Sequence, residues 1–468
     1  MFDSVTAALL RSAPALPGLS PDDLPSLFTL HYTELVSVRL RGDSNTFNEQ
    51  FSQEWTLDKI ADAYELLVST LEDSPQKRAS AYVAATAHQI LSRQNKENAS
   101  TEEEESSYGI TRDAVPSDVA AALLFLIAEQ YADAHEASLA IDLPDAGLYE
   151  SRILIENIRD LTNGQLHSIL ERAARWRKKK GRVSSLQEQA LRESLNALIT
   201  GVEMLAANIL NKDYESVGPS TYDSAELLFE HVIALSYYSR QDFIVSGENP
   251  LFSLYPGPRH LASLLLAGTR TLEKASLAKI PPPNNVDSPF WSKWIRHRAE
   301  QYPFLWPNHQ EAIGKNFYDT GKSAVLVLPT GAGKTTVSSL KIAAVLASGK
   351  RVIFLAPTHA LVDQMATDLQ EMLPNNLYET AVGTDFDLSF FTDFELSSEI
   401  EVMTPERCLA LLSFAPETFA DVGLLVFDEC HMLSPEKHDI RRAVDSMLCV
   451  LAFNSVVSDA DMLFYLLC

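Results

Sequence analysis

Residues 328–335 read Leu-Pro-Thr-Gly-Ala-Gly-Lys-Thr, an order of residue types that can hold a chain of phosphates. Gly331 and Gly333 allow a tight turn that residues with a side chain rarely adopt, so backbone N–H groups can point inward at an anion. Lys334 supplies a cation for the β- and γ-phosphates, and Thr335 supplies a hydroxyl for Mg²⁺. The segment therefore predicts a loop that binds a nucleoside triphosphate together with magnesium.

Such a loop needs a strand before it and a helix after it. Residues 324–328 form a short apolar run, as expected of a buried parallel strand. A helix that starts near Lys334 would add the positive end of its dipole. Leu328 stands where the general phosphate-loop pattern has glycine, which narrows the match to a Pro-Thr-Gly-x-Gly-Lys-Thr variant. The residues expected to bind the nucleotide here are Thr330, Gly331, Ala332, Gly333, Lys334, Thr335 and Thr336.

A second box, Asp428-Glu429-Cys430-His431, follows the apolar run 424–427. Ligand sites of parallel sheets lie at the carboxyl ends of the strands, where these carboxylates are expected. Asp428 would hold magnesium, and Glu429 would orient and deprotonate the attacking water. His431 would couple the nucleotide to the rest of the protein. Acidic pairs alone usually lie on solvated faces, but the strand and the phosphate loop upstream favour a functional role.

Four other segments surround the two boxes. They are Leu-Trp-Pro-Asn-His-Gln (305–310), Phe-Leu-Ala-Pro-Thr-His-Ala-Leu-Val (354–362), Ala-Val-Gly-Thr (381–384) and Val-Met-Thr-Pro-Glu-Arg (402–407). They resemble, in this order, the adenine-recognition region, motif Ia, a short glycine motif and motif Ib of superfamily 2 helicases. The likeness is to the DEAD/DEAH type with a Ski-type character, and it covers residues 300–468. Each motif is modest alone, whereas the ordered set is specific.

The resemblance implies ATP with Mg²⁺ as cofactors, and ATP hydrolysis coupled to unwinding of nucleic acid or translocation along it. Gln310 would read the adenine edge. Thr358, Thr404 and Arg407 would contact the sugar-phosphate backbone of one strand, with DNA favoured over RNA. Each threonine has an equally plain structural explanation, because threonine at a strand end commonly caps the next helix.

The expected fold is an α-helical N-terminal region followed by an α/β RecA-like (P-loop NTPase) domain with a parallel sheet. Helical spacing of apolar residues predicts helices over residues 117–134, 186–210, 226–240 and 260–276. Ser117 is the expected N-cap of the first of these helices. Within the first 280 residues, strand-like alternation is scarce apart from a short run around residues 35–40.

Three regions follow from this pattern. Residues 1–280 form a helical accessory region, with an acidic stretch at 95–109 expected to be disordered. Residues 281–299 are a linker and lead-in that begin with three prolines. Residues 300–468 form the first RecA-like motor domain. The second motor domain, its arginine finger and the Ser-Ala-Thr box expected after residues 462–467 are missing, which indicates a fragment, a truncated product or a split motor.

The composition bears on partners and compartment. The chain has 38 basic and 63 acidic residues, a net charge of −25, so nucleic-acid binding needs a local basic patch. Residues 172–182 hold seven basic residues and Trp176, which could stack on a base. The alternative is a charged helix end. Four cysteines without metal-binding spacing and no apolar run of membrane-spanning length indicate a cytoplasmic protein that does not act at a membrane.

The helical region carries no enzymatic motif. We expect it to dock a protein partner, with guidance of nucleic acid as the alternative. The chain also resembles the helicase subunit of Hachiman-type anti-phage defence systems, although no short motif carries this likeness. The prediction for the whole chain is the ATP-binding half of a helicase or translocase motor, weak or inactive alone. The alternative is a non-catalytic, ATP-responsive regulatory protein.

Overall fold

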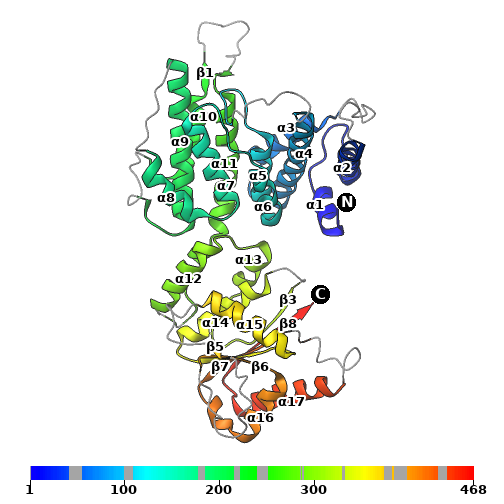
Figure 1. Ribbon diagram of the computed structural model, residues 1–468, viewed down its shortest axis with the longest axis vertical. Helices are drawn as coiled ribbons and strands as arrows, with labels where there is room; N and C mark the ends of the chain where they lie inside the picture. Colours follow the sequence, from blue (N-terminus) through cyan, green and yellow to red (C-terminus); the bar gives the residue numbers. More distant parts are fainter. Residues whose placement is uncertain are drawn as a thin grey trace. The chain divides into compact units, whose positions relative to one another are not determined.

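The computed structural model describes residues 2–41, 55–99, 109–177, 185–214, 222–239, 251–284, 286, 289–328, 333–373, 382–383, 398–428, 430 and 440–467. The chain divides into two compact units (Figure 1). The helical unit comprises Met1–Lys279 and Ala299–Trp306, and the motor unit comprises Ile280–Arg298 and Pro307–Cys468. Of the helices in these ranges, none is both long and apolar enough to cross a membrane.

The helical unit is built from packed helices with one short hairpin. Its centre is α5 (Ser117–Ile127), in which every residue from Val119 to Ile127 is buried. A helix that is apolar on all sides must be surrounded by other helices. The other elements are α1 (Ser4–Arg11), η1 (Pro21–Asp23), α2 (Leu24–Arg41), α3 (Leu57–Thr70), α4 (Pro75–Ala99), α6 (Tyr131–Leu139), α7 (Tyr149–Thr162), α8 (Leu166–Trp176), α9 (Leu186–Ile209), α10 (Ala225–Leu235), β1 (Tyr237–Ser239), β2 (Leu251–Ser253), α11 (Pro256–Lys274) and η3 (Leu277–Lys279).

Several expectations for this unit need correction. The helix predicted over 117–134 is two helices, because Glu129 takes a positive φ of 59° between α5 and α6. Ser117 is the first helical residue, and Pro116 occupies the N-cap without a side-chain bond. Residues 35–40 belong to α2 instead of a strand. Residues 95–99 of the expected disordered stretch are helical in α4, and residues 100–108 lie outside the described part of the chain.

The motor unit contains one six-stranded parallel sheet in the order β3-β8-β7-β4-β6-β5. In Figure 1, α14 and α15 lie on one side of the sheet and α16 and α17 on the other. The elements are α12 (Pro289–Gln301, which from Ala299 on belongs to the helical unit), α13 (Pro307–Gly314), β3 (Ala324–Leu328), α14 (Lys334–Ala347), β4 (Arg351–Leu355), α15 (His359–Met372), β5 (Val382–Gly383), β6 (Ile400–Met403), α16 (Pro405–Phe414), η4 (Pro416–Phe419), β7 (Val422–Phe427), α17 (Ile440–Val456) and β8 (Asp461–Leu467).

The fold class predicted from the sequence is confirmed. The apolar run 324–328 is β3, and the helix expected near Lys334 is α14. Strand β8 is inserted between β3 and β7, so it separates the strand of the phosphate loop from the strand of the acidic box. Because all the strands are parallel, the segments after β3, β4, β6 and β7 meet at one edge of the sheet.

Candidate nucleotide-binding site

At the carboxyl edge of the sheet, backbone hydrogen bonds join the residues that follow β4 and β7 to the ends of the neighbouring strands. The N–H of Ala356 donates to the carbonyl of Met403 at 3.0 Å, and the N–H of Asp428 donates to the carbonyl of Leu355 at 3.2 Å. Asp428 directly follows β7 and is half-buried. The strand-end position expected for this carboxylate is therefore confirmed. Glu429 and His431 lie outside the described residues, so their roles stay predictions.

The start of α14 combines a special backbone conformation with a close contact. Gly333 occupies the N-cap with φ 72° and ψ 37°, in the left-handed region that favours glycine. A Cβ at this position would lie 2.7 Å from Nε2 of His309, which is buried. Lys334, Thr335 and Thr336 form the first turn and are half-buried. Thr330, Gly331 and Ala332 lie outside the described residues.

Glycine has no side chain that could cap the helix, and within the described ranges no side chain caps α14, so its first N–H groups can serve an anion. The hydroxyl of Ser338 donates to the carbonyls of Lys334 and Thr335 at 3.0 and 3.1 Å. These hydrogen bonds join the first turn of α14 to the second. A helix start with this geometry is suited to phosphate, and Lys334 places a cation in its first turn.

Tyr465 of β8 lies between the two halves of the site. It pairs with Leu326 of β3, and Phe464 before it pairs with Phe427 of β7. Tyr465 is therefore next in register to Asp428. Burial raises the pKa of Tyr465 well above its usual range, and the charge of Asp428 raises it further. The strand that leads into the phosphate loop and the strand that ends at Asp428 thus flank β8 and its buried Tyr465.

Of the segment expected to recognise adenine, residues 307–310 lie on α13 and residues 305–306 precede it. Gln310 is half-buried and follows His309, whose ring contacts the position of Gly333. The helix that carries the expected adenine reader therefore contacts the helix that carries the expected phosphate binder. His309 was not identified as a site residue from the sequence. Its only signal was its place beside Gln310.

Thr358 and Thr404 are helix N-caps. Thr358 accepts a hydrogen bond from the N–H of Leu361 at 3.3 Å, and Thr404 accepts one from the N–H of Arg407 at 3.4 Å. Their helices, α15 and α16, start at the carboxyl edge after β4 and β6. Arg407 is half-buried in the first turn of α16. The capping role is thus present in both threonines, and contact with a nucleic-acid backbone stays a prediction.

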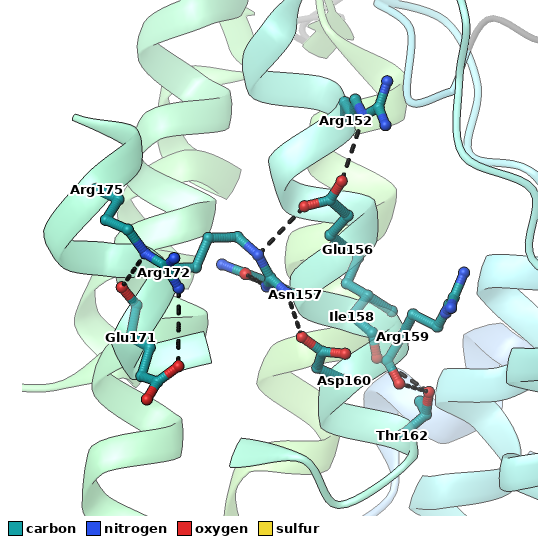
Figure 2. A network of polar contacts seen from close by, with 10 residues as sticks. All are labelled: Arg152, Glu156, Asn157, Ile158, Arg159, Asp160, Thr162, Glu171, Arg172 and Arg175. Carbon is teal, nitrogen blue, oxygen red and sulfur yellow. Dashed lines mark hydrogen bonds and ion pairs between the residues drawn. The ribbon is translucent and has the colours of Figure 1, made fainter. Parts of the chain in front are cut away.

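The arginines of the basic segment 172–182 that the structure describes make contacts within the helical unit. Figure 2 shows Arg172 of α8 directed at α7, where its Nε lies 3.2 Å from Glu156 and its Nη atoms contact Asn157 and Asp160. Arg175 pairs with Glu171 of its own helix at 3.7 Å. The charged-helix-end alternative therefore accounts for these arginines.

Trp176 does not offer a stacking surface, which corrects the expectation drawn from the sequence. Its side chain is buried, and Nε1 donates to Glu203 at 2.7 Å. Glu203 is fully buried in α9 and also binds Arg177 and the hydroxyl of Tyr214. The physical reason is that a buried carboxylate needs several donors, and Trp176 is one of them. Lys178, Lys179, Lys180 and Arg182 lie outside the described residues.

Comparison with known proteins identifies the type of domain. Residues 307–458 match the DEAD/DEAH box helicase family. The ATP-dependent DNA helicase Hel308 of Thermococcus kodakarensis is 29% identical over 166 residues, which cover 34% of this chain and 14% of that protein. Hel308 of Thermoplasma acidophilum is 28% identical over 148 residues, 30% of this chain and 22% of that protein. The predicted likeness to DEAD/DEAH-type helicases is confirmed.

These matches concern a part of each protein. The aligned segments span less than a quarter of the two helicases. The crystal structure of T. fusca Cas3 with ATP covers 98% of this chain and 50% of its own, at 12% identity. Its TM-score of 0.26 is too low to inform the arrangement of the chain.

Proposed function

We propose that this chain, whose residues 307–458 match the DEAD/DEAH box helicase family, is the ATP-binding half of a nucleic-acid helicase or translocase motor. The observation that supports this most directly is the placement of Lys334 and Asp428. They lie at the start of α14 and the end of β7, and β8 with the buried Tyr465 lies between β7 and the strand that precedes α14 in one parallel sheet. The chain aligns with less than a quarter of each relative, so the activity of the whole protein is part of this proposal.

The residues of the site fit Mg²⁺ and ATP by their chemistry. Thr335 and Asp428 offer the oxygen ligands that magnesium prefers. When bound, the metal would offset negative charge on the phosphates. Lys334 would bind the β- and γ-phosphates, while the first N–H groups of α14 would orient them. Glu429 would hold a proton of the attacking water on its carboxylate, and Gln310 would select adenine.

For the remaining partners we propose two surfaces. Thr358, Thr404 and Arg407 would guide one strand of DNA past the starts of α15 and α16. The named relatives are DNA helicases, which favours DNA over RNA. The helical unit would dock a protein partner. Any function of the chain in anti-phage defence would depend on that partner. Loss of protection against phage after deletion of residues 1–279 would support this role, and unchanged plating efficiency would contradict it.

The test of the proposed function is ATP binding and turnover by the chain, with and without single-stranded DNA or RNA. Lys334→Ala is the variant, and Lys315→Ala is the matched control, because Lys315 is an exposed lysine of the same unit paired with Glu311 at 2.6 Å. We expect MgATP to bind the chain and the control but not Lys334→Ala. Failure of the unaltered chain to bind MgATP would overturn the proposal.

Turnover separates the two candidate functions. Hydrolysis that rises with nucleic acid and vanishes in Lys334→Ala supports a working motor. Binding of MgATP without any turnover, even with nucleic acid, supports the alternative of an ATP-responsive regulatory protein.

A further inference from the structure

Lys341 is a lysine with no exposed surface on the helix that follows the phosphate loop. Its Nζ donates to Oδ2 of Asp461 at 2.7 Å, to the carbonyl of Lys322 at 2.9 Å and to the carbonyl of Asp319. An ammonium group has three N–H donors, so all of them are used. Burial lowers the pKa of Lys341, and the hydrogen bond with Asp461 opposes this shift.

The partners of Lys341 come from two other elements. Asp461 is the buried first residue of β8, and its Oδ2 also accepts the N–H of Gly321 at 2.9 Å. Asp319, Gly321 and Lys322 form the turn that leads into β3. Gly321 has a φ of 81°, in the region that favours glycine. One ammonium group therefore joins α14, the start of β8 and the turn before β3.

This junction fixes the two elements that border the phosphate-binding turn, at the start of β3 and two helical turns into α14. Strand β3 leads into the turn, and α14 leads out of it. Fixing the start of β3 against α14 sets the separation and register of the strand and the helix, and therefore the shape available to the turn between them. The contact lies two helical turns away from Lys334, so Lys341 acts on the site through the backbone and does not touch the nucleotide.

Stability alone is a weak explanation for such a pair. Removing two charges from water costs several kcal/mol per ion, and apolar side chains of similar volume are often as stable in the same place. What an ion pair with three fixed acceptors adds is one defined geometry. That property is useful where the position of a backbone turn decides the affinity for a ligand.

The same turn also holds the segment that leads into the motor unit. The side chain of Asp319 accepts hydrogen bonds from the backbone N–H and the amide of Asn284 at 3.0 and 2.8 Å. The hydroxyl of Tyr318 donates to the carbonyl of Pro281 at 3.1 Å. The proline-rich segment 281–284 is thus anchored on the turn that Lys341 binds.

We propose that Lys341 is a positioning residue of the nucleotide site: its junction with Asp461 and the turn 319–322 sets the geometry of the phosphate loop. The inference rests on the proposed function, since it concerns the same site. The proposal predicts that loss of the Lys341–Asp461 pair weakens nucleotide binding even in a variant that keeps the stability of the unaltered chain.

The experiment compares MgATP affinity, from titration with a fluorescent analogue, with the melting temperature. Lys341→Met removes the ammonium group but leaves Asp461 charged and buried, so it is expected to lower both. Lys341→Met with Asp461→Asn removes both charges, and the new amide can still accept from Gly321 and donate to a carbonyl. We expect this double variant to regain most of the melting temperature while its affinity stays weaker by about threefold or more.

Ile342→Val is the matched control, because Ile342 is the next residue of α14 and is equally buried. It removes one methyl group and is expected to lower the melting temperature without changing the affinity. Recovery of affinity together with the melting temperature in the double variant would overturn the proposal. Weakening of affinity by Ile342→Val in proportion to stability would overturn it too.

Two further points keep the result decisive. Lys341→Gln is neutral and has two N–H donors for the three acceptors, so it breaks the junction in part and can replace the methionine variants if these do not fold. Unchanged affinity in Lys341→Gln would contradict the proposal. If the unaltered chain does not bind MgATP and matches Lys334→Ala, the proposed function fails, whereas binding that is insensitive to Lys341 refutes the positioning role alone.

Discussion

Glycine at position 333 is required for two separate reasons. Its φ of 72° disfavours other residues, and its Cα faces the ring of His309 so closely that a Cβ would lie 2.7 Å from Nε2. Gly349, at the other end of α14, has a similar φ of 75° but nothing within 4 Å of a Cβ. The two glycines therefore separate backbone strain from the contact with His309.

We predict that Gly333→Ala weakens MgATP binding by about tenfold or more, because the start of α14 or the buried ring of His309 beside it must shift. Gly349→Ala should lower the free energy of unfolding by about 1 kcal/mol and leave nucleotide affinity unchanged. Isothermal titration and thermal melting of both variants check this. Equal loss of affinity in the two variants would show that strain, and not the contact with His309, decides the result.

A second residue-scale prediction concerns a buried carboxylate in the helical unit. Glu65 of α3 contacts His88 of α4 at 2.6 Å and His260 of α11 at 2.7 Å. Burial alone would raise the pKa of Glu65, but the hydrogen bonds and charges of His260 and His88 lower it to about 2. Burial alone would lower the pKa of His260, but Glu65, helped by the charge of Asp62 and opposed by Arg259, raises it above 6.5.

The sign of the pH dependence follows from these two shifts. Stability from Glu65 is present above its unfolded pKa of about 4.5 and is lost as the pH falls toward 2. Stability from His260 is complete below 6.5 and is lost as the pH rises through its raised pKa. The cluster should therefore stabilise the helical unit most between about pH 4.5 and 6.5.

Glu65→Gln should remove this dependence and cost about 2–3 kcal/mol of unfolding free energy inside that pH window, because charged hydrogen bonds are lost. The measurement is chemical denaturation at a series of pH values for the unaltered chain and the variant. A difference between the two curves that does not change with pH would refute the prediction.

At the scale of elements, local pattern predicted the motor better than the helical unit. Strands β3 and β7 were visible because each is a short apolar run that ends at a chemical motif. The strand predicted around residues 35–40 was wrong. Helix α2 buries Leu35 and Val38 and exposes Val36 and Leu40, and apolar residues on both faces of a helix can alternate in the sequence as they do in a strand. The break between α5 and α6 is a single residue with positive φ inside an apolar stretch, and helical spacing does not reveal it.

The candidate site shows the same limit. The strand end before Asp428 and the helix start at Lys334 could be predicted, because both follow from short local motifs. The partners of Trp176 and Lys341 could not, because Glu203 and Asp461 lie on elements distant in the sequence. Pairing across helices and strands is decided by packing, which the spacing of residues in one segment does not encode.

Helix α17 carries a prediction of its own. One face, with Ala443, Cys449 and Phe453, is buried in the motor core. Another face exposes apolar side chains at helical spacing, namely Ile440 (65%), Val444 (47%), Met447 (51%), Leu448 (48%) and Leu451 (61%). A contiguous apolar stripe of this kind promotes association.

We predict that Met447→Lys with Leu451→Glu reduces self-association of the chain without lowering its melting temperature, because both side chains are half exposed or more. The new side chains lie one helical turn apart and can pair. Analytical ultracentrifugation over a range of concentrations measures the effect. Phe453→Ala is the contrast, since truncation of this fully buried ring should cost about 3–5 kcal/mol. A fall in melting temperature for the surface variant would mean that the stripe is part of the fold.

At the scale of the whole molecule, the chain consists of two units that each have a core of their own. The helical unit is centred on α5, and the motor unit has a cluster around Leu425, Phe427 and Phe453. Units with separate cores can unfold separately. The proline-rich segment 281–284 is hydrogen-bonded within the motor unit, so it should melt with the motor.

We therefore predict two transitions in calorimetry. MgATP at about a hundredfold excess over its dissociation constant should raise the motor transition by about 5 °C or more and leave the other in place. Glu65→Gln should lower the transition of the helical unit and leave the motor transition in place, because Glu65, His88 and His260 all belong to the helical unit. Each change thus reports on one unit and serves as the control for the other. A single transition that both changes shift would mean that the two units unfold as one cooperative block, and a ligand at the nucleotide site would then stabilise the helical unit as well.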